Sequence, residues 1–290
     1  MWDEWGPLAR RDHRVININI DPSALGHPVM HEVAMQADAA QALNDLLDAT
    51  VNQTNSIGSD WLSQLRAVRQ KYEQGLLDSP TAVDGVMHPA ALAIAIGKAI
   101  GTTIPSDTLA VFDGGHTTFW SNDLTPVHNV RTRFHEPGMS HLGFGLPYAL
   151  ALQLLHTNKV VFNITGDGSF GFSLQELDTA RRNRLNVITI IHNNATWGII
   201  RAGQKKQLNF ELGTSLEGSD YAAIARGFRC HGETVNQVNE FEPALKRSLA
   251  SGLPAVLDCR TCFVPHPASP MFGSMNRYGF DALTKFQVQS

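Results

Sequence analysis

Four mostly apolar runs in the second half of the chain have the pattern of buried strands. They cover residues 108–112, 160–165, 187–191 and 255–264, and they are rich in Val, Ile, Leu and Phe. Strands of parallel sheets are covered on both faces and show such runs, without the alternation of half-exposed strands. Because helical patterns separate these runs, we predict an α/β fold with a doubly wound parallel sheet.

The segments between the runs carry helix signals. Apolar residues at helical spacing predict helices over residues 90–100, 148–155 and 220–226. Ser173 with Glu176, and Asn239 with Glu242, have the spacing of a capping box, in which the side chains at both positions satisfy free amides at a helix start. We therefore expect two further helices that begin at these positions.

The first 87 residues have a different organisation. Residues 14–20 alternate in polarity and predict a strand that Asp21-Pro22 ends, and residues 37–47 predict a helix. A second helix is expected from Ser59, with an apolar stripe that we interpret as an ordinary packing face. The stripe consists of Trp61, Leu65, Val68 and Tyr72.

We divide the chain into four parts from these patterns. Glycine and proline in the stretch before His88 indicate a linker over residues 75–87. The linker separates residues 1–74 from a main domain at 88–264, and residues 265–290 form a tail rich in Pro, Met and Gly.

Charge and composition exclude several classes of partner. The chain has 290 residues and a net charge of −4, without the basic surface that nucleic acids or acidic membranes require. No apolar stretch approaches the roughly 20 residues of a membrane span, and the first residues lack the features of a signal peptide. We therefore expect a cytoplasmic protein that binds neither nucleic acid nor membrane.

The three cysteines do not predict a metal or redox site. Cys259 and Cys262 are three residues apart in a predicted strand and would face opposite sides of it, and Cys230 stands alone. No second pair completes a zinc site, so we interpret all three as free thiols of a reducing compartment.

Candidate chemistry appears where two of the predicted strands end. Gly166-Asp167-Gly168 follows the run at 160–165, and Asn193-Asn194 follows the run at 187–191. Parallel strands bring both segments to the same sheet edge. Glycine amides approach a phosphate closely, while carboxylate, amide and carbonyl oxygens suit Mg²⁺. The pattern predicts a phosphate and Mg²⁺ site.

Gly-Asp-Gly followed after 24 residues by Asn-Asn resembles the diphosphate-binding motif of thiamine-diphosphate enzymes. Residues 88–264 are similar to the diphosphate-binding domain of the acetolactate synthase, 2-oxoacid decarboxylase and 2-hydroxyacyl-CoA lyase superfamily. The resemblance implies thiamine diphosphate and Mg²⁺ as cofactors. It implies metal ligation by the Asp167 and Asn194 side chains and the Thr196 carbonyl. Residues at the diphosphate would be Gly115, His116, Thr117, Gly166, Gly168 and Ser169.

A second segment, Ser140-His-Leu-Gly-Phe-Gly145, resembles the part of the family that binds the cofactor rings. It implies that Leu142 wedges between the rings and enforces a bent cofactor, where synthases commonly have Met. The Ser140 carbonyl and the Leu142 amide would bind the pyrimidine edge.

Several other side chains are weaker candidates. His116 and His141 lie in the cofactor segments and are candidates for proton handling. Trp197, Ile200 and Gln204 have two interpretations of equal standing. They lie near the substrate or form a lid, or they are ordinary packed or exposed residues. We interpret the remaining histidines near the predicted site as packing or surface residues, namely His88, His135 and His192.

The resemblance also implies that something is missing. Residues 1–74 are similar to the end of the Rossmann-like central domain of the large family members. The pyrimidine-binding domain, which carries the activating Glu and acts across a subunit interface, has no counterpart here. We therefore expect an oligomer in which another chain supplies that domain, or a truncated product.

The expected reaction is acetolactate-synthase-like carboligation of 2-oxoacids or related acyl donors. A 2-oxoacid decarboxylase, a 2-hydroxyacyl-CoA lyase and a non-catalytic cofactor-binding fragment remain as alternatives.

Overall fold

The computed structural model describes residues 14–25, 32–52, 59–136, 139 and 141–267. The chain divides into two compact units, one formed by residues 1–68 with 270–290 and the other by residues 69–269. No helix of the described ranges is long and apolar enough to cross a membrane.

The larger unit is built on a six-stranded sheet with the order β6-β5-β7-β8-β10-β9. All of its strand pairs are parallel, which confirms the predicted fold class. The strands are β5 (Leu109–Phe112), β6 (Arg133–Phe134), β7 (Val161–Gly166), β8 (Ile188–Asn193), β9 (His231–Val235) and β10 (Ala255–Arg260). The apolar runs thus form the central strands, whereas the short edge strand β6 and the half-buried strand β9 have no such run.

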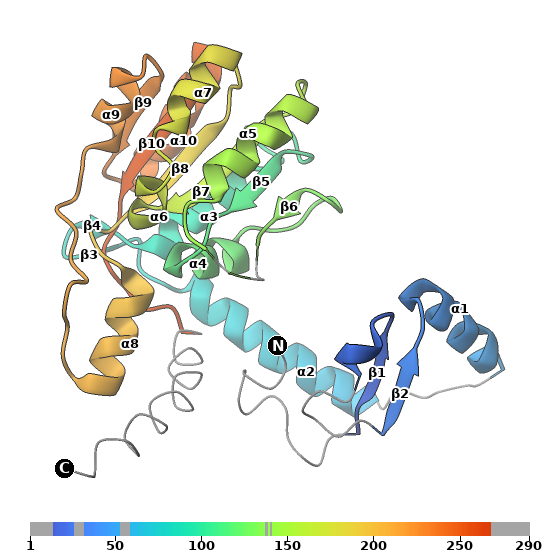
Figure 1. Cartoon of the computed structure of the whole chain (residues 1–290). Helices are drawn as coiled ribbons and strands as arrows, with labels where there is room; N and C mark the ends of the chain where they lie inside the picture. The colour runs from blue at the N-terminus through green and yellow to red at the C-terminus, as the bar shows by residue number, and fades with distance from the viewer. Residues whose placement is uncertain (1–13, 26–31, 53–58, 137–138, 140, 268–290) are drawn as a thin grey trace, which may run out of the picture. The chain divides into compact units, whose positions relative to one another are not determined.

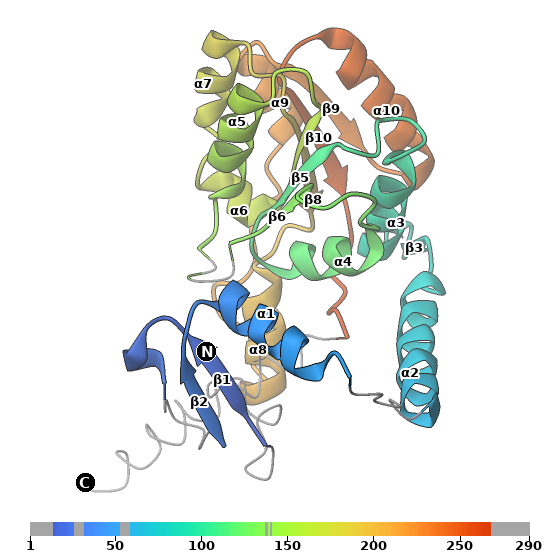
Figure 2. The same cartoon turned by 90° about the vertical axis from the view of Figure 1, so that its right-hand side faces the viewer.

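Helices cover both faces of this sheet (Figures 1 and 2). On one face lie α3 (Pro89–Ala99) and α10 (Val238–Ser251), with α4 (His116–Leu124) packed against α3. On the other face lie α5 (Gly145–Leu155), α7 (Glu176–Asn183) and α9 (Tyr221–Gly227). The short α6 (Asp167–Gly171) follows β7, and α8 (Gly198–Leu208) follows the loop after β8.

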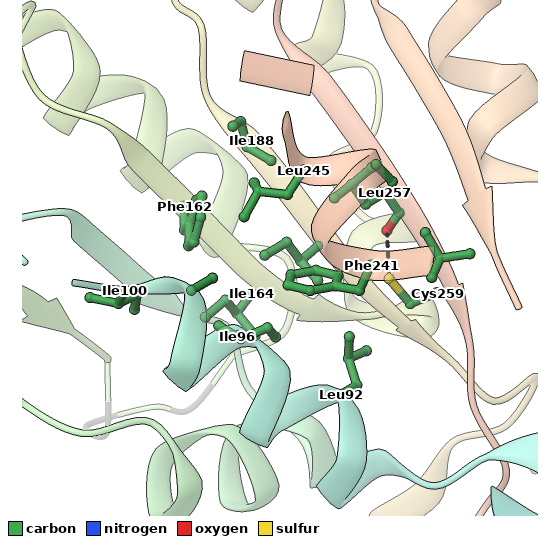
Figure 3. Packing of buried hydrophobic residues seen from close by; sticks show 14 of the residues in the cluster. Leu92, Ile96, Ile100, Phe162, Ile164, Ile188, Phe241, Leu245, Leu257 and Cys259 are labelled. Atoms are coloured by element: carbon green, nitrogen blue, oxygen red, sulfur yellow. Dashed lines mark hydrogen bonds between the residues drawn. The ribbon is translucent and has the colours of Figure 1, made fainter. Parts of the chain in front are cut away.

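Each helical layer has its own hydrophobic core. Between α3, α10 and the sheet, Ile96, Phe162, Ile164 and Phe241 are completely buried (Figure 3). The opposite core includes Phe170, Leu146 and Val256. Burial of whole large apolar side chains stabilises a fold by about 1.5–3 kcal/mol each, so these two cores fix the sheet from both sides.

Two helix starts differ from the prediction. Ser173 does not begin a helix: α7 starts at Glu176 after Gln175, and the buried Ser173 hydroxyl has no hydrogen-bond partner among the described residues. The capping box of α10 lies two residues earlier than expected, where Glu240 accepts the Gln237 amide at 3.2 Å. Pro243 is therefore the sixth residue of the helix, and because proline has no amide hydrogen, the Asn239 carbonyl lacks its usual helical donor.

Two predicted loops are helical. His116 and Thr117 form the first turn of α4, and Asp167 to Gly171 form α6. Glycine signals had indicated turns, but α6 begins directly after β7, and α4 begins after a short segment, residues 113–115, that follows β5. The last predicted strand is also shorter than expected and ends at Arg260, so Cys262 lies beyond it; all three cysteines are free.

The described part of the smaller unit contains a parallel pair of strands, a helix and the beginning of the long helix that follows. Strand β1 (Ile16–Asn19) pairs with β2 (Val33–Gln36), which the sequence pattern did not predict. A 3-10 turn (Pro22–Ala24) follows β1, and the Asp21 side chain caps it. Helix α1 (Ala39–Thr50) is capped by Asp38 and confirms the predicted helix.

Helix α2 (Ser59–Leu77) begins as predicted but extends through Gly75 into the predicted linker. The rest of the linker forms a small hairpin, β3 (Ala82–Val83) with β4 (Val86–Met87). The stripe of Trp61, Leu65, Val68 and Tyr72 is exposed by 41% or more at each position. The proposed domain limits remain a prediction.

Candidate cofactor site

The candidate residues lie where β5, β7 and β8 end. These strands are parallel neighbours, so their carboxyl ends share one edge of the sheet. From β5 the chain crosses to β6 on one side, and from β7 it crosses to β8 on the other, so strand order reverses between β5 and β7. Open α/β sheets bind ligands at such a switch point.

Gly115 and the start of α4 follow β5 at this edge. Gly115 precedes the helix with a φ of 97°, a backbone conformation that a residue with a Cβ rarely adopts. His116 and Thr117, both buried, are the first helical residues. The free amides of a helix start favour an anion, so this segment is chemically suited to a phosphate group.

Asp167 follows β7 and is the clearest cation ligand of the edge. Its carboxylate is buried, and its Oδ1 accepts the Gly168 amide at 2.9 Å. Its Oδ2 has no hydrogen-bond partner among the residues described. Burial raises the pKa of Asp167 to about 6. A buried carboxylate oxygen without a partner fits a bound cation, which would stabilise the ionised form and lower this pKa.

Asn194 and Thr196 form the turn after β8. The Asn194 Oδ1 accepts the Thr196 amide at 3.2 Å, and Ala195 between them has a φ of 53°. The Thr196 hydroxyl donates to the Thr214 carbonyl at 2.7 Å, which ties the turn to a later loop. The turn therefore presents amide and carbonyl oxygens next to the end of the strand that neighbours β7.

No three His, Cys, Asp or Glu side chains gather into a metal-binding cluster within the described ranges. The predicted ligand set contains one carboxylate and otherwise neutral oxygens. That set suits Mg²⁺, which takes few protein ligands and completes its shell with phosphate oxygens and water.

Trp197 covers the Gly-Asp-Gly segment. A Cβ added to Gly168 would lie 2.4 Å from the indole ring of Trp197, so only glycine allows this approach. Phe172 contacts Trp197 with ring centroids 5.9 Å apart, and a Cβ on Gly143 would meet Phe172 at 2.5 Å. The aromatic pair thus connects the segments at Gly168 and Gly143.

Leu142 lies near the start of α4. Its Cδ2 is 3.9 Å from where a Cβ of Gly115 would stand, so the structure brings these two predicted cofactor residues together. Ser140 lies outside the described residues. Gln204 pairs with the Leu212 backbone at 2.8 and 3.2 Å, and Ile200 is 55% exposed.

The histidines have different surroundings. The His116 Nε2 accepts the His266 amide at 2.9 Å, and burial lowers the pKa of His116 to about 4, so its ring is neutral at pH 7. His141 is exposed, with its Nδ1 3.4 Å from Glu136. His88 and His192 are buried, and His135 is exposed with its Nδ1 2.8 Å from the Phe112 carbonyl.

Asp258 supports the site from β10 and was missed by the sequence patterns. It accepts the Asn193 side chain at 2.8 Å and the Tyr221 amide at 3.1 Å, and it pairs with Arg260 at 2.9 Å. The Tyr221 hydroxyl in turn donates to the Asp167 carbonyl at 2.9 Å. The Asn193 side chain is therefore held by Asp258, whereas the Asn194 side chain accepts the Thr196 amide. An acid inside an apolar strand is the available sequence signal, because a buried charge requires partners.

Asp113, which directly follows β5, was also missed by the sequence patterns. It is completely buried. Burial raises the pKa of Asp113, although four hydrogen bonds to its carboxylate act in the opposite direction. Its partners come from the segments after β5, before α5 and at the end of β7.

A comparison with models of known protein families shows which family the chain belongs to. The model described as thiamine pyrophosphate enzyme, C-terminal TPP binding domain, matches residues 113–259. The chain belongs to this family. The match begins at Asp113 and ends in β10, so it covers the segments that follow β5, β7 and β8 at the site. Family membership confirms the resemblance found from Gly166–Gly168 and Asn193–Asn194.

The curated relatives of this chain share less than a third of its residues over the aligned part. The chain is 29% identical over 245 residues to the acetolactate synthase isozyme 2 large subunit of Escherichia coli K12, covering 84% of this chain and 42% of that protein. It is 26% identical over 253 residues to the acetolactate synthase large subunit of Pyropia yezoensis, covering 85% and 41%. The chain thus spans less than half the length of these relatives.

A solved structure has the same fold. The thiamine diphosphate-dependent 4-hydroxybenzoylformate decarboxylase of Rhodococcus jostii RHA1 superposes with a TM-score of 0.68 at 24% identity. The similarity covers 87% of this chain and 44% of that structure.

Proposed function

We propose that the chain binds thiamine diphosphate through Mg²⁺ and forms the cofactor-holding part of an acetolactate-synthase-like enzyme. The observation that carries this proposal is the unpartnered, buried Oδ2 of Asp167 at the sheet edge that the family model covers. In the proposal, Asp167, Asn194 and the Thr196 carbonyl hold the metal.

The remaining predicted residues have separate tasks. Amides of Gly168, Ser169 and the start of α4 hold the diphosphate, and Leu142 supports the rings. His116 is neutral because its Nε2 accepts the His266 amide, so a proton role at pH 7 begins from the unprotonated imidazole. When bound, the cofactor supplies the carbanion chemistry that makes or breaks a carbon–carbon bond beside a carbonyl.

The test of the cofactor site is calorimetric titration with thiamine diphosphate in the presence of Mg²⁺. We expect saturable binding to the purified chain and a loss of at least tenfold in affinity for Asp167→Ala, because the variant removes the only carboxylate of the proposed metal site. Asp178→Ala is the matched control, since Asp178 pairs with Arg182 on the exposed face of α7. Equal binding by Asp167→Ala and wild type would refute the metal assignment.

The reaction requires a separate test. We propose pyruvate or a related 2-oxoacid as donor, and carboligation as the outcome, because acetolactate synthase subunits are among the relatives. The activating Glu is expected from a pyrimidine-binding domain on another chain. Acetolactate formation and CO₂ release are measured with and without such a chain. Release of CO₂ with free aldehyde, and without acetolactate, would favour a decarboxylase instead.

A further inference from the structure

Asp113 connects three segments of the proposed site. Its Oδ1 accepts the amides of Gly114 at 2.7 Å and Gly143 at 3.1 Å. Its Oδ2 accepts the Gly145 amide and the Thr165 hydroxyl, at 3.3 and 3.2 Å. Its own amide donates to the Ile164 carbonyl at 2.9 Å, which fixes Asp113 to β7.

The segment before α5 is closely fitted to this carboxylate. Gly143 has a φ of 92°, and its amide reaches Oδ1 from this left-handed conformation. A Cβ on Gly145 would lie 2.8 Å from the Asp113 Cβ and 2.4 Å from the Asn163 Oδ1. Leu142 is the neighbour of Gly143, so its backbone position depends on the hydrogen bonds at Asp113.

The choice of a carboxylate is informative. The three glycine amides around Asp113 can only donate, so both carboxyl oxygens must accept, and the Thr165 hydroxyl lies within hydrogen-bond distance of the same group. A completely buried charge costs several kcal/mol of desolvation, and an apolar residue would pack the sheet edge at lower cost. We therefore interpret the carboxylate as a group that fixes the relative positions of the three segments to which it is hydrogen-bonded.

We propose that Asp113 is a positioning residue that holds Leu142 against Gly115, and so shapes the ring side of the cofactor site. This inference rests on the proposed function in naming the cofactor, but the hydrogen bonds exist without it. The four side-chain hydrogen bonds of Asp113 described above involve none of the proposed metal ligands.

Asp113→Asn is the informative variant. The amide oxygen replaces one carboxylate oxygen, and the NH₂ group takes the place of the other. With the NH₂ group at the Oδ2 position, the Thr165 hydroxyl reverses and accepts, but the Gly145 amide faces another donor. Thr165→Val is the milder variant, since it removes one donor and leaves the three amides bound.

The first measurement needs no cofactor. In a sample labelled with ¹⁵N at glycine, we expect slow amide hydrogen exchange at Gly143 and Gly145 in the wild type. Asp113→Asn accelerates exchange at Gly145 at least tenfold, while Gly97 inside α3 is unchanged. Rapid exchange at both glycines in the wild type would overturn the proposal even if no variant folds.

The second measurement separates positioning from general destabilisation. We expect Asp113→Asn to weaken thiamine diphosphate binding about tenfold, the loss typical of a hydrogen bond to a charged group. Binding of inorganic diphosphate with Mg²⁺ changes less than threefold, because it makes no use of Leu142. Equal weakening of both ligands would overturn the ring-side role. If the wild type binds neither ligand, the proposed function fails, and the exchange data still decide whether Asp113 holds the segment.

Discussion

Three buried carboxylates at the sheet edge differ in how their charge is compensated. Asp113 accepts four hydrogen bonds. Asp258 accepts hydrogen bonds from the Asn193 side chain and the Tyr221 backbone amide, and it forms an ion pair with Arg260. Asp167 has an oxygen with no such partner in the described part of the chain. The carboxylate that lacks compensation is the one for which a metal is proposed.

Sequence reasoning found Asp167 because its signal is local. Gly-Asp-Gly directly after an apolar run indicates the end of a strand, a turn and an acidic side chain within ten residues. The partners of Asp113 and Asp258 come from Gly143, Thr165, Asn193 and Tyr221, which are far away in sequence. Their pairing depends on strand order, which no local pattern contains.

A single glycine tests the packing of the sheet edge strand. A Cβ on Gly232 would lie 2.2 Å from the Ala222 carbonyl oxygen, which belongs to the backbone of α9. We expect Gly232→Ala to lower the free energy of unfolding by about 2–3 kcal/mol, because backbone moves less readily than a side chain. Urea denaturation measures this change.

Gly203→Ala is the control for that substitution. Gly203 lies inside α8 with no atom within 4 Å of an added Cβ. Alanine is the better helix former there, so a stabilisation of about 0.5–1 kcal/mol is expected. Similar losses from both substitutions would contradict the packing argument.

At the scale of helices and strands, the existence of elements was easier to predict than their limits. The buried strands β5, β7, β8 and β10 and the helices α1, α3 and α9 were confirmed. The short helices at His116 and Asp167 were predicted as loops, because glycine is common to turns and to helix starts. Edge strands β6 and β9 were missed because they are short or only half-buried.

His88 at the start of α3 leads to a prediction about how the stability of the fold depends on pH. The Nδ1 of buried His88 accepts the Ala90 amide at 3.1 Å, which only a neutral ring allows, and burial lowers the pKa of His88. The folded state therefore binds fewer protons than the unfolded state below the ordinary pKa of about 6.5. Stability is retained above that value and is lost as the pH falls below it.

His88→Asn separates this histidine from the others. Asparagine keeps a helix cap but has no titrating ring, so the variant should lose less stability than the wild type between pH 7.5 and 5.5. His88→Ala should cost about 1 kcal/mol at pH 7.5, from loss of the cap. Urea denaturation at both pH values provides the comparison. Identical pH dependence in wild type and His88→Asn would remove His88 as a cause.

At the scale of the whole molecule, family membership is secure while the reaction is a proposal. The family model and the relatives cover most of the larger unit, yet the chain spans 42% of the Escherichia coli relative. The activity and substrates of these relatives therefore enter the account of this chain as a proposal.

Cofactor binding should stabilise the folded chain by mass action. At one hundred times the dissociation constant, a ligand that binds only the folded state adds about 2.7 kcal/mol to the free energy of unfolding. We expect thermal denaturation to shift upward with thiamine diphosphate and Mg²⁺ together. Excess EDTA should abolish the shift if Mg²⁺ joins the diphosphate to Asp167. A shift that survives EDTA would count against a metal-dependent site.

The strand order of the sheet also sets conditions on biosynthesis. Strand β10, the last one within the described residues, lies between β8 and β9, so the sheet has a gap until the ribosome has produced residues 255–260. Until then β9 has no neighbour, and β8 presents an open edge that other chains can pair with. Nascent chains of this protein should therefore depend on chaperones late in synthesis, and a stop codon shortly before Ala255 should yield aggregated protein.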